Sequence, residues 1–430
     1  MNNLQIPSGW HKQTLGRIAS IRIGKTPPRD HDEFWDVHKQ SQNVWLSIRD
    51  MTSRYLSDSA EYITDKAIRE FNIPAVEMGT ILLSFKLTIG KVAIAQRELR
   101  TNEAIAAIKI LDSDQTDNDF LSYGLSHWNL LQNVDQAIKG ATLNKKKLRE
   151  IEFTLPIDPA EQRAIADILS IVDEAIAQSE SLVRKYQSIK QGLMSDLLTR
   201  GVDENEELRE PNELVETKIG ILPRMWTILS LGELISKGGF IQTGPFGSQL
   251  HSYEYVEEGI PVIMPQDIME DGYISKDNIT KITTDKTKEL SRHIVKPNDV
   301  VFARRGDLSR CSAISEREAG WLCGTGSMLV RLPQMEVDGR WLAAIYRHEI
   351  GQHQVRARAV GSTMVNLNST LLRDLIIPKP SLEEQERIMG MIQAQDNLLK
   401  AEIENLAKLQ LLKQGLMQDL LSGQVRVGSS

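Results

Sequence analysis

The stretch KQGLMSDLL at residues 190–198 occurs a second time, as KQGLMQDLL at residues 413–421. The two copies differ only at Ser195 against Gln418 and are 223 residues apart. Solenoid proteins repeat every 20–50 residues or so, and this spacing is far longer than that. The repeat therefore predicts two large modules in tandem.

Further matches extend the repeat outward from this stretch. The residues EQ at 161–162 recur at 384–385 with the same spacing of 223 residues. Upstream, LREI at 148–151 matches LRDL at 372–375. At the starts of the modules, Trp10 with a following Leu-Gly matches Trp226 with a following Leu-Gly. Each module thus consists of a globular part followed by a long helical part.

The helical parts have clear start signals and an apolar stripe. Asp158 and Pro159 supply an N-cap and a proline at the first helical position, and Ser381 begins a matching capping box. Apolar residues then recur with alternating spacings of three and four, which is typical of a coiled-coil seam. Each helix has about 40 residues and a length of roughly 60 Å. We expect the two helices to pack together through Ile165, Ile168, Val172, Leu182, Tyr186, Ile189 and Leu193 of the first and Ile388, Ile392, Leu399, Ile403, Leu406 and Leu416 of the second.

The globular parts carry mixed signals of strand and helix. Their patterns predict strands at residues 75–84, 89–95, 297–302 and 313–315, and helices at residues 119–133 and 339–349. The predicted fold class is therefore α/β (α+β) globular domains in tandem repeat, joined by two long α-helices. The predicted segments are 1–157, 158–200, 201–221, 222–380 and 381–430.

Charge is distributed unevenly along the 430 residues. The net charge is −7, and residues 201–221 alone hold seven acidic and two basic side chains. We expect this segment to be a solvated connector between the modules. The negative net charge of the chain argues against a protein that coats nucleic acid non-specifically. It is still compatible with a positive face on each globular part.

Several classes of protein are disfavoured by what the sequence lacks. It has no run of about 18 apolar residues and no basic region followed by an apolar core near Met1, so we expect a cytoplasmic protein. The two cysteines, Cys311 and Cys323, fit a reducing compartment.

No phosphate-binding loop, dinucleotide fingerprint or base-holding N-P-P-[YF] motif is present. His348 and His353 are five residues apart, which is the wrong spacing for one face of a metal-binding helix. We therefore expect no catalysis, cofactor or metal site in this chain.

This arrangement resembles the specificity subunit of type I restriction–modification systems. The resemblance rests on the paired Trp and Leu-Gly module starts, the repeated EQ at the helix starts and the repeated KQGLMxDLL at the helix ends. Pro159 departs from the repeat, because Leu382 occupies the matching position.

The resemblance implies a function and a set of partners. Each globular part would be a target-recognition domain for one half of a bipartite, non-palindromic DNA site. The helices would form an antiparallel coiled coil that sets the spacer length. The chain would join two modification subunits, which methylate adenine at N6, and through them restriction subunits. S-adenosylmethionine, ATP and Mg²⁺ would be bound by those partner subunits.

Basic and glycine-rich loops are the candidate DNA contacts. Arginine can grip guanine through two hydrogen bonds, whereas lysine more often contacts phosphate. Ordinary solvated loop charges are the alternative for the basic residues, and a structural turn is the alternative for residues 242–249. The candidates are Lys86, Thr88, Lys91, Lys145, Lys146, Lys147, Gly244, Ser248, Arg304, Arg305, Ser309 and Arg310.

Two rival functions predict different behaviour. A single-chain DNA methyltransferase or nuclease would transfer methyl groups or cut DNA without partners, and the missing motifs speak against it. A scaffold that binds only proteins would show no salt-dependent DNA binding.

Overall fold

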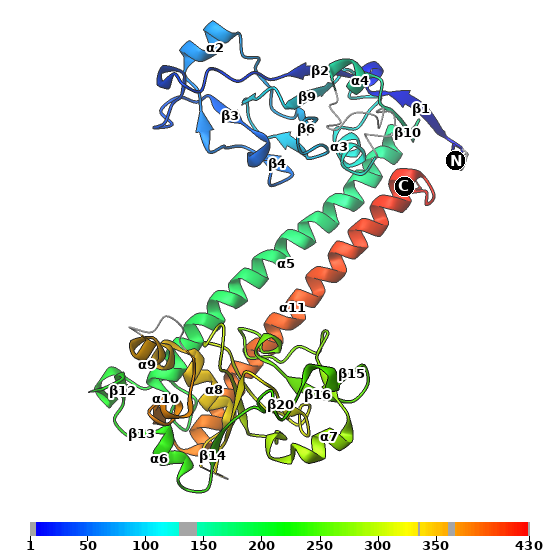
Figure 1. The fold of residues 1–430 in the computed structure, drawn as a ribbon. Coiled ribbons are helices and arrows are strands. Elements are labelled where there is room, and N and C mark those ends of the chain that lie inside the picture. The colour runs from blue at the N-terminus through cyan, green and yellow to red at the C-terminus, as the bar shows by residue number, and fades with distance from the viewer. Residues whose placement is uncertain (1–5, 129–143, 334–335, 360–365, 429–430) are drawn as a thin grey trace. The chain divides into compact units, whose positions relative to one another are not determined.

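The computed structural model describes residues 6–128, 144–333, 336–359 and 366–428. It divides into two compact units (Figure 1). Unit 1 comprises Met1–Ser181 and Ile403–Ser430, and unit 2 comprises Leu182–Glu402. Each unit contains one globular part and a section of both long helices. The predicted boundaries follow the ends of these helices, whereas the compact units divide each helix near its middle.

Unit 1 is built on a five-stranded sheet with the order β2-β9-β6-β7-β4. A smaller sheet with the order β5-β3-β8 lies in the same unit. The strands are short and strongly apolar, and Leu83, Ile108 and Phe120 are fully buried in one core. The elements of the globular part are β2 (Ala19–Ile23), β3 (Val44–Leu46), β4 (Tyr55–Leu56), β5 (Glu61–Tyr62), α2 (Asp65–Phe71), β6 (Ile81–Ser84), β7 (Val92–Ala95), β8 (Arg100–Thr101), β9 (Ile105–Ile110) and α3 (Asn118–His127).

Unit 2 has two four-stranded sheets, with the orders β14-β21-β18-β19 and β15-β17-β16-β20. Trp341 of α8 is fully buried in its core. The elements are β14 (Phe240–Thr243), β15 (Tyr255–Val256), β16 (Ile260–Ile263), β17 (Lys281–Ile282), α7 (Thr284–Glu289), β18 (Val300–Ala303), β19 (Cys311–Ala313), β20 (Leu322–Cys323), β21 (Ser327–Arg331), α8 (Gly339–Arg347) and α9 (Glu349–Ala359).

The predicted mixed α/β fold is confirmed, although several predicted strands are shorter than expected. Residues 75–80 are excluded from β6 because Gly79 turns the chain with a φ of 81°. Residues 297–299 are excluded from β18 because Asn298 has a φ of 72°. The predicted helix at 119–133 is present as α3 up to His127, and its last five residues lie outside the described residues.

Each globular part is closed by an antiparallel pair that joins its first strand to the strand before the long helix. In unit 1, β1 (Trp10–Thr14) pairs with β10 (Glu152–Pro156), and in unit 2, β13 (Thr227–Ser230) pairs with β22 (Ile376–Lys379). Short helices follow the first strands and precede the last ones. They are α1 (Leu15–Ile18), α4 (Lys145–Arg149), α6 (Leu231–Ile235) and α10 (Ser369–Arg373).

The matches in sequence correspond to matching contacts. The Leu15 N–H donates to the Ile151 carbonyl at 2.9 Å, and the Leu231 N–H donates to the Leu375 carbonyl at 2.8 Å. The repeated glutamine ties each helix start to its own globular part. In unit 1, the Gln162 side chain accepts from the Asp117 N–H at 2.8 Å, and in unit 2, Gln385 accepts from the Asp338 N–H at 2.9 Å.

The long helices are α5 (Pro159–Arg200) and α11 (Leu382–Ser422). In unit 1, the beginning of α5 lies beside the end of α11, so the two helices run in opposite directions (Figure 1). The last leucines of each helix enter a globular core. Leu420 and Leu421 pack with Trp10 in unit 1, and Leu197 and Leu198 pack with Trp226 in unit 2.

The packed stripe of the helices departs from the predicted seam. Leu182, Ile189 and Ile403 are 38%, 42% and 46% exposed. The less exposed residues instead recur with alternating spacings of four and three, and the stripe includes polar side chains such as those of Ser179 and Lys190. The observed stripes are Ile165, Leu169, Val172, Ile176, Ser179, Val183, Tyr186, Lys190, Leu193 and Leu197 in α5, and Ile388, Ile392, Gln395, Leu399, Glu402, Leu406, Leu409, Lys413, Leu416 and Leu420 in α11.

The segment at 201–221 is not a simple solvated connector, so that expectation is wrong in part. Its acidic run at 204–207 is exposed, but Val202 and Arg209 are buried in unit 2. Both Arg209 and the Val202 N–H bind the Glu384 carboxylate, which anchors the segment. The segment then leads into a hairpin of β11 (Leu214–Thr217) and β12 (Gly220–Pro223).

Candidate nucleic-acid interface

Two equivalent hairpin loops lie at matching positions of the two sheets. The unit 1 hairpin loop, residues 85–91, connects β6 to β7, and the unit 2 hairpin loop, residues 304–310, connects β18 to β19. The Ser84 N–H donates to the Lys91 carbonyl at 2.9 Å, and the Ala303 N–H donates to the Arg310 carbonyl at the same distance. The loops therefore have equal length and can be aligned residue by residue.

The unit 1 hairpin loop carries positive charge and no acidic residue. Thr88 is exposed, while Lys86 and Lys91 are half-buried. The Lys91 ammonium donates to the Ile48 carbonyl at 3.3 Å, which holds its side chain against the short 3-10 helix Ile48–Asp50 after β3. The prediction that this segment connects two strands is confirmed.

The unit 2 hairpin loop holds three arginines with different surroundings. Arg304 donates from Nε to the Leu367 carbonyl at 3.2 Å. The Arg310 Nε lies 3.2 Å from the Asp307 carboxylate. Arg305 is exposed, and among the described residues it has no carboxylate partner. Arg305 is thus the most available of the three to a ligand.

Asp307 orders the unit 2 hairpin loop. The Ser309 hydroxyl donates to its carboxylate at 2.6 Å. This hydrogen bond, together with the Arg310 guanidinium, holds the pKa of Asp307 below its ordinary value. The carboxylate therefore stays ionised and fixes Ser309 and Arg310 on the loop.

The glycine-rich segment after β14 lies next to the unit 2 hairpin loop. The Arg304 guanidinium carbon is 5.7 Å from the centroid of the exposed Phe246 ring. Ser248 is exposed, whereas Gly244 is buried, and a Cβ on Gly244 would lie 1.9 Å from the Gly324 carbonyl oxygen. Gly244 therefore has a structural reason to be glycine, which favours the turn alternative at this position.

The three lysines at 145–147 begin α4. Asn144 caps this helix by accepting from the Lys147 N–H at 2.9 Å. In the part of the chain that the structure describes, these lysines form no hydrogen bond or ion pair with the unit 1 hairpin loop. In unit 2, the residue before the cap of α10 is Leu367, and its N–H donates to the Arg304 carbonyl at 3.0 Å. The matching residue before α4 lies outside the described residues.

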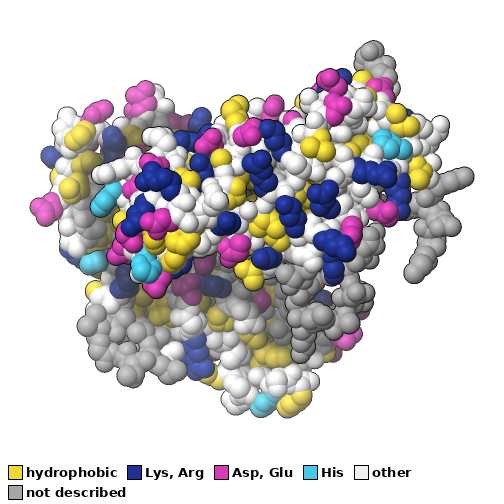
Figure 2. Space-filling model, turned by 90° about the horizontal axis from the view of Figure 1, so that it is seen from above, with side chains coloured by type: hydrophobic (Ala, Val, Ile, Leu, Met, Phe, Trp, Pro, Cys, Tyr) yellow, Lys and Arg dark blue, Asp and Glu magenta, His cyan; other side chains and the backbone are white. Residues whose placement is uncertain are grey.

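Positive side chains gather on part of the surface. Figure 2 shows Lys and Arg side chains grouped over the middle of the face in view, with hydrophobic side chains between them. A chain of net charge −7 thus still presents local positive charge. Such local charge can attract DNA phosphates without making the whole protein basic.

The model of the type I restriction modification DNA specificity domain matches this chain twice, at residues 7–189 and 223–414. The chain belongs to this family. The two matches cover the two modules of the repeat, so the predicted tandem organisation is confirmed. The chain is a specificity subunit with a role in DNA recognition, and it is a non-catalytic component of a restriction–modification complex.

Curated relatives and a solved structure agree with this assignment. The chain is 22% identical over 439 residues to the type I restriction enzyme MjaVIII specificity subunit of Methanocaldococcus jannaschii, covering 99% of this chain and 95% of the relative. It is 24% identical over 315 residues to the MjaIX specificity subunit of the same organism, covering 70% and 68%. The fold resembles the S subunit of a type I system from M. genitalium with a TM-score of 0.58, 16% identity and coverage of 98% and 97%.

An arginine site in unit 1 of this specificity subunit was missed by the sequence analysis. The Arg29 guanidinium carbon lies 4.0 Å from the centroid of the Trp35 ring and 4.8 Å from that of the Trp45 ring. Glu61 pairs with Arg29 and also with Arg49, the latter at 2.6 Å. The available signal was Gly24, which matches Gly244 in the repeat and opens the segment that leads to Arg29.

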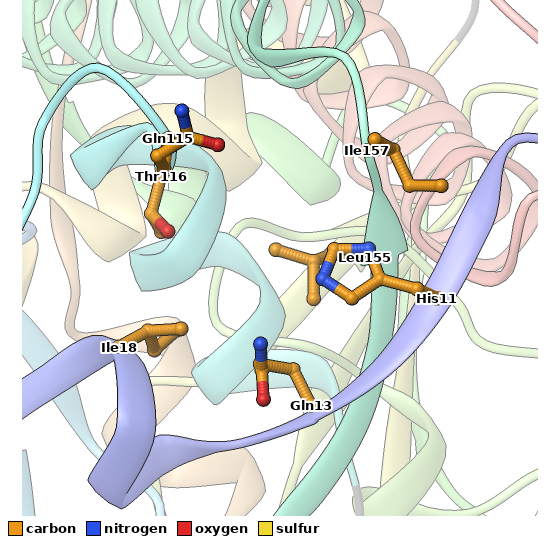
Figure 3. A pocket seen from close by; sticks show the side chains of 7 residues that line it. All are labelled: His11, Gln13, Ile18, Gln115, Thr116, Leu155 and Ile157. Atoms are coloured by element: carbon orange, nitrogen blue, oxygen red, sulfur yellow. The ribbon is translucent and has the colours of Figure 1, made fainter.

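A pocket of about 420 Å³ lies beside the first strand of unit 1 (Figure 3). His11 and Gln13 line one side, and Thr116 lies across from them (Figure 3). At the matching place in unit 2, the Glu336 carboxylate and the Lys379 ammonium form an ion pair at 2.6 Å. The described residues that line this pocket of the specificity subunit include no paired carboxylates and no activated nucleophile.

The described residues offer little for covalent or metal chemistry. They contain no group of three or more His, Cys, Asp or Glu side chains that could hold a metal ion. Cys311 and Cys323 are buried, and burial raises the pKa of the Cys311 thiol to about 11 and that of Cys323 further. Neither thiol is poised to act as a nucleophile. No helix among the described residues is long and apolar enough to cross a membrane.

Proposed function

We propose that each unit of this specificity subunit recognises one half of a bipartite, non-palindromic DNA site through its hairpin loop. The observation that carries the proposal is the pair of equally long loops at equivalent positions, one with two lysines and the other with three arginines. Equivalent backbones with different side chains suit two half-sites of different sequence. Arg305 is the best candidate for a base contact, because it is exposed and arginine can bind guanine through two hydrogen bonds.

The other candidate residues have supporting roles in this proposal. Lys86, Lys91 and the lysines at 145–147 would contact phosphates and so position unit 1 on the duplex. In unit 2, Arg304 and Arg310 would do the same. Thr88 of unit 1 and Ser248 of unit 2 would add hydrogen-bond donors, whereas Ser309, whose hydroxyl donates to Asp307, would act by ordering the loop. Gly244 would act only by shaping the segment that carries Phe246 and Ser248.

We further propose that the long helices set the spacer length and bind two modification subunits. The helices have 42 and 41 residues and are each roughly 60 Å long, which is long enough to set a distance between two half-sites. Their surfaces expose apolar side chains suited to protein contact, namely Ile171, Leu182, Ile189, Leu398, Ile403, Leu411 and Leu412. Restriction subunits would join through the modification subunits.

The chemistry in this proposal belongs to the partners. The modification subunits would use S-adenosylmethionine to methylate adenine at N6, and the restriction subunits would use ATP and Mg²⁺. The flipped adenine would be held by the modification subunit, because duplex methylation needs base flipping. The proposed location is the cytoplasm, where such a complex meets DNA.

The test uses the chain co-purified with its modification subunits. Single-molecule sequencing maps N6-methyladenine on a plasmid treated with the complex and S-adenosylmethionine. The expected result is one bipartite motif, with a modified adenine on each strand. Arg305→Ala should relax or lose the base preference in one half only, whereas Lys288→Ala, on the exposed surface of α7, should leave the motif unchanged. An active modification subunit that leaves the plasmid unmodified would overturn the proposal and favour the scaffold alternative.

A further inference from the structure

The unit 1 hairpin loop ends in an exposed leucine with an unusual backbone. Leu87 is 93% exposed and has a φ of 62°. The loops align residue by residue, and the matching residue of the unit 2 hairpin loop is Gly306, with a φ of 77°. The same left-handed position is therefore occupied by leucine in one unit and by glycine in the other.

Leucine is the more costly residue at this position. A left-handed backbone brings the Cβ of an L-residue close to the following carbonyl oxygen, and glycine avoids this contact. Burial of the side chain could compensate, but Leu87 is almost fully exposed. Among the described residues of unit 1, no burial of the side chain offsets this strain, and a contact with a bound partner is a physical reason for an apolar side chain here.

Hydrogen bonds and buried neighbours anchor the loop on both sides of the exposed Leu87. The Lys91 N–H donates to the Ser84 hydroxyl at 2.9 Å, and the Gly90 N–H donates to the Ser84 carbonyl at 2.9 Å. Phe85 is fully buried and Ile89 packs against the same core. Because both flanks are anchored, the leucine side chain is presented as a rigid tip.

The charge around this tip fits DNA better than protein. Lys86 and Lys91 flank Leu87, and no acidic residue occurs in the loop. Proteins that distort DNA commonly insert leucine and similar apolar wedges between base steps, with basic residues on the adjacent phosphates. The length and shape of a leucine side chain at a hairpin tip match this use.

We propose that Leu87 is an apolar wedge that inserts between two adjacent base pairs of the half-site bound by unit 1 and unstacks them. This inference rests on the proposed DNA recognition by unit 1. Only the half-site bound by unit 1 would then be unstacked, because Gly306 offers no side chain at the matching tip of unit 2. Unstacking beside the target adenine lowers the cost of flipping that base out of the duplex.

The experiment uses the chain with its modification subunits and a duplex that contains the mapped site. 2-Aminopurine replaces one base at a time, outside the two target adenines, whose own flipping would give a signal. With the native chain, fluorescence is expected to rise at one step of the unit 1 half and at none of the unit 2 half. Leu87→Gly should abolish this rise and weaken binding by about tenfold. Leu111→Gly, which removes another exposed leucine of unit 1, should change neither.

Three results would overturn the wedge. Leu87→Gly could leave fluorescence and affinity unchanged, or it could weaken binding with the fluorescence rise intact, which would indicate a groove contact. It could also release the modification subunits in a pull-down, which would indicate a protein contact. Thermal unfolding of Leu87→Gly guards against misfolding, and its midpoint is expected to equal or exceed that of the native chain. A native complex that does not bind DNA at all would instead overturn the proposed function.

Discussion

The Lys413 ammonium lies 2.6 Å from the Asp173 carboxylate and joins α11 to α5 within unit 1. The related pair in unit 2 is Lys190 with Asp396, at 2.7 Å. Each lysine opens one copy of the KQGLM motif, and each pair combines a lysine from one copy of the repeat with an aspartate from the other. The repeated lysine thus gains its partner only when two copies of the repeat pack in opposite directions.

Replacing either aspartate by asparagine should destabilise the unit that contains it. Asp173→Asn and Asp396→Asn are each expected to lower the free energy of unfolding by about 1–2 kcal/mol, since the partners are only partly exposed. Asp173→Asn should have the larger effect, because Asp173 also accepts from the Tyr123 hydroxyl at 2.8 Å. Urea denaturation provides the measurement. Asp167→Asn, on the exposed side of α5, is the control, and an equal loss in that variant would contradict the assignment.

A second reciprocal pair differs in burial and predicts unequal effects. Arg209 and Glu384 are both buried in unit 2, and Glu384 also accepts from the Trp226 indole at 3.1 Å. In unit 1, Glu161 pairs with Arg426, whose side chain is 43% exposed.

Arg209→Ala is expected to lower the free energy of unfolding by about 3–5 kcal/mol, because it leaves the Glu384 carboxylate buried without its cation. Arg426→Ala should lower it by less, since the Arg426 side chain is partly exposed and water can replace part of the lost interaction. Urea denaturation of both variants under the same conditions compares them. Equal losses would show that burial does not decide the strength of these pairs.

The organisation of the chain was predictable from the repeat, because the matched residues make matched contacts. The glutamines at 162 and 385 bind the globular parts, and the leucines that end each KQGLMxDLL motif fill the cores. The seam between the helices was harder to predict. The predicted stripe passes through Leu182 and Ile189 because they are more apolar than Ser179 and Lys190, which belong to the observed stripe. Ion pairs and the anchored helix ends outweigh apolar periodicity here.

The candidate site was predictable only in outline. The two basic loops were visible because glycine and charged residues interrupt apolar strands. The exposure of Arg305 and the pairing of Arg310 with Asp307 depend on the folded loop. The aromatic surroundings of Arg29 arise only when the folded chain brings Trp35 and Trp45 against its guanidinium. The left-handed backbone of Leu87 also has no local signal, because leucine rarely adopts it.

Gly244 and Gly247 provide a matched test of the segment that carries Phe246. A Cβ on Gly244 would lie 1.9 Å from the Gly324 carbonyl oxygen, whereas a Cβ on Gly247 would meet nothing within 4 Å. Gly244→Ala is expected to lower the free energy of unfolding by about 1–3 kcal/mol, and Gly247→Ala to leave it nearly unchanged. Thermal unfolding of the two variants checks this. A stable Gly244→Ala variant that has lost only DNA binding would instead restore a direct phosphate role for Gly244.

His293 makes the stability of unit 2 depend on pH. Its ring is buried, and the Gln242 side-chain nitrogen lies 3.0 Å from its Nδ1. Burial lowers the pKa of His293 below its ordinary value of 6.5. The unfolded chain therefore binds a proton at a pH where the folded chain does not, so the free energy of unfolding should fall as the pH decreases below about 6.5.

His293→Gln should flatten this dependence, because glutamine takes up no proton in either state. The measurement is the free energy of unfolding from urea titrations at pH 5.5 and 7.5, and the difference between these values is expected to shrink by up to about 1 kcal/mol in the variant. The pKa of His127 and that of His348 are lowered by burial as well, so part of the dependence should remain. His38→Gln, at an exposed position, should keep the full difference. If His293→Gln keeps the full difference too, the buried imidazole is not the group that the unfolded state protonates.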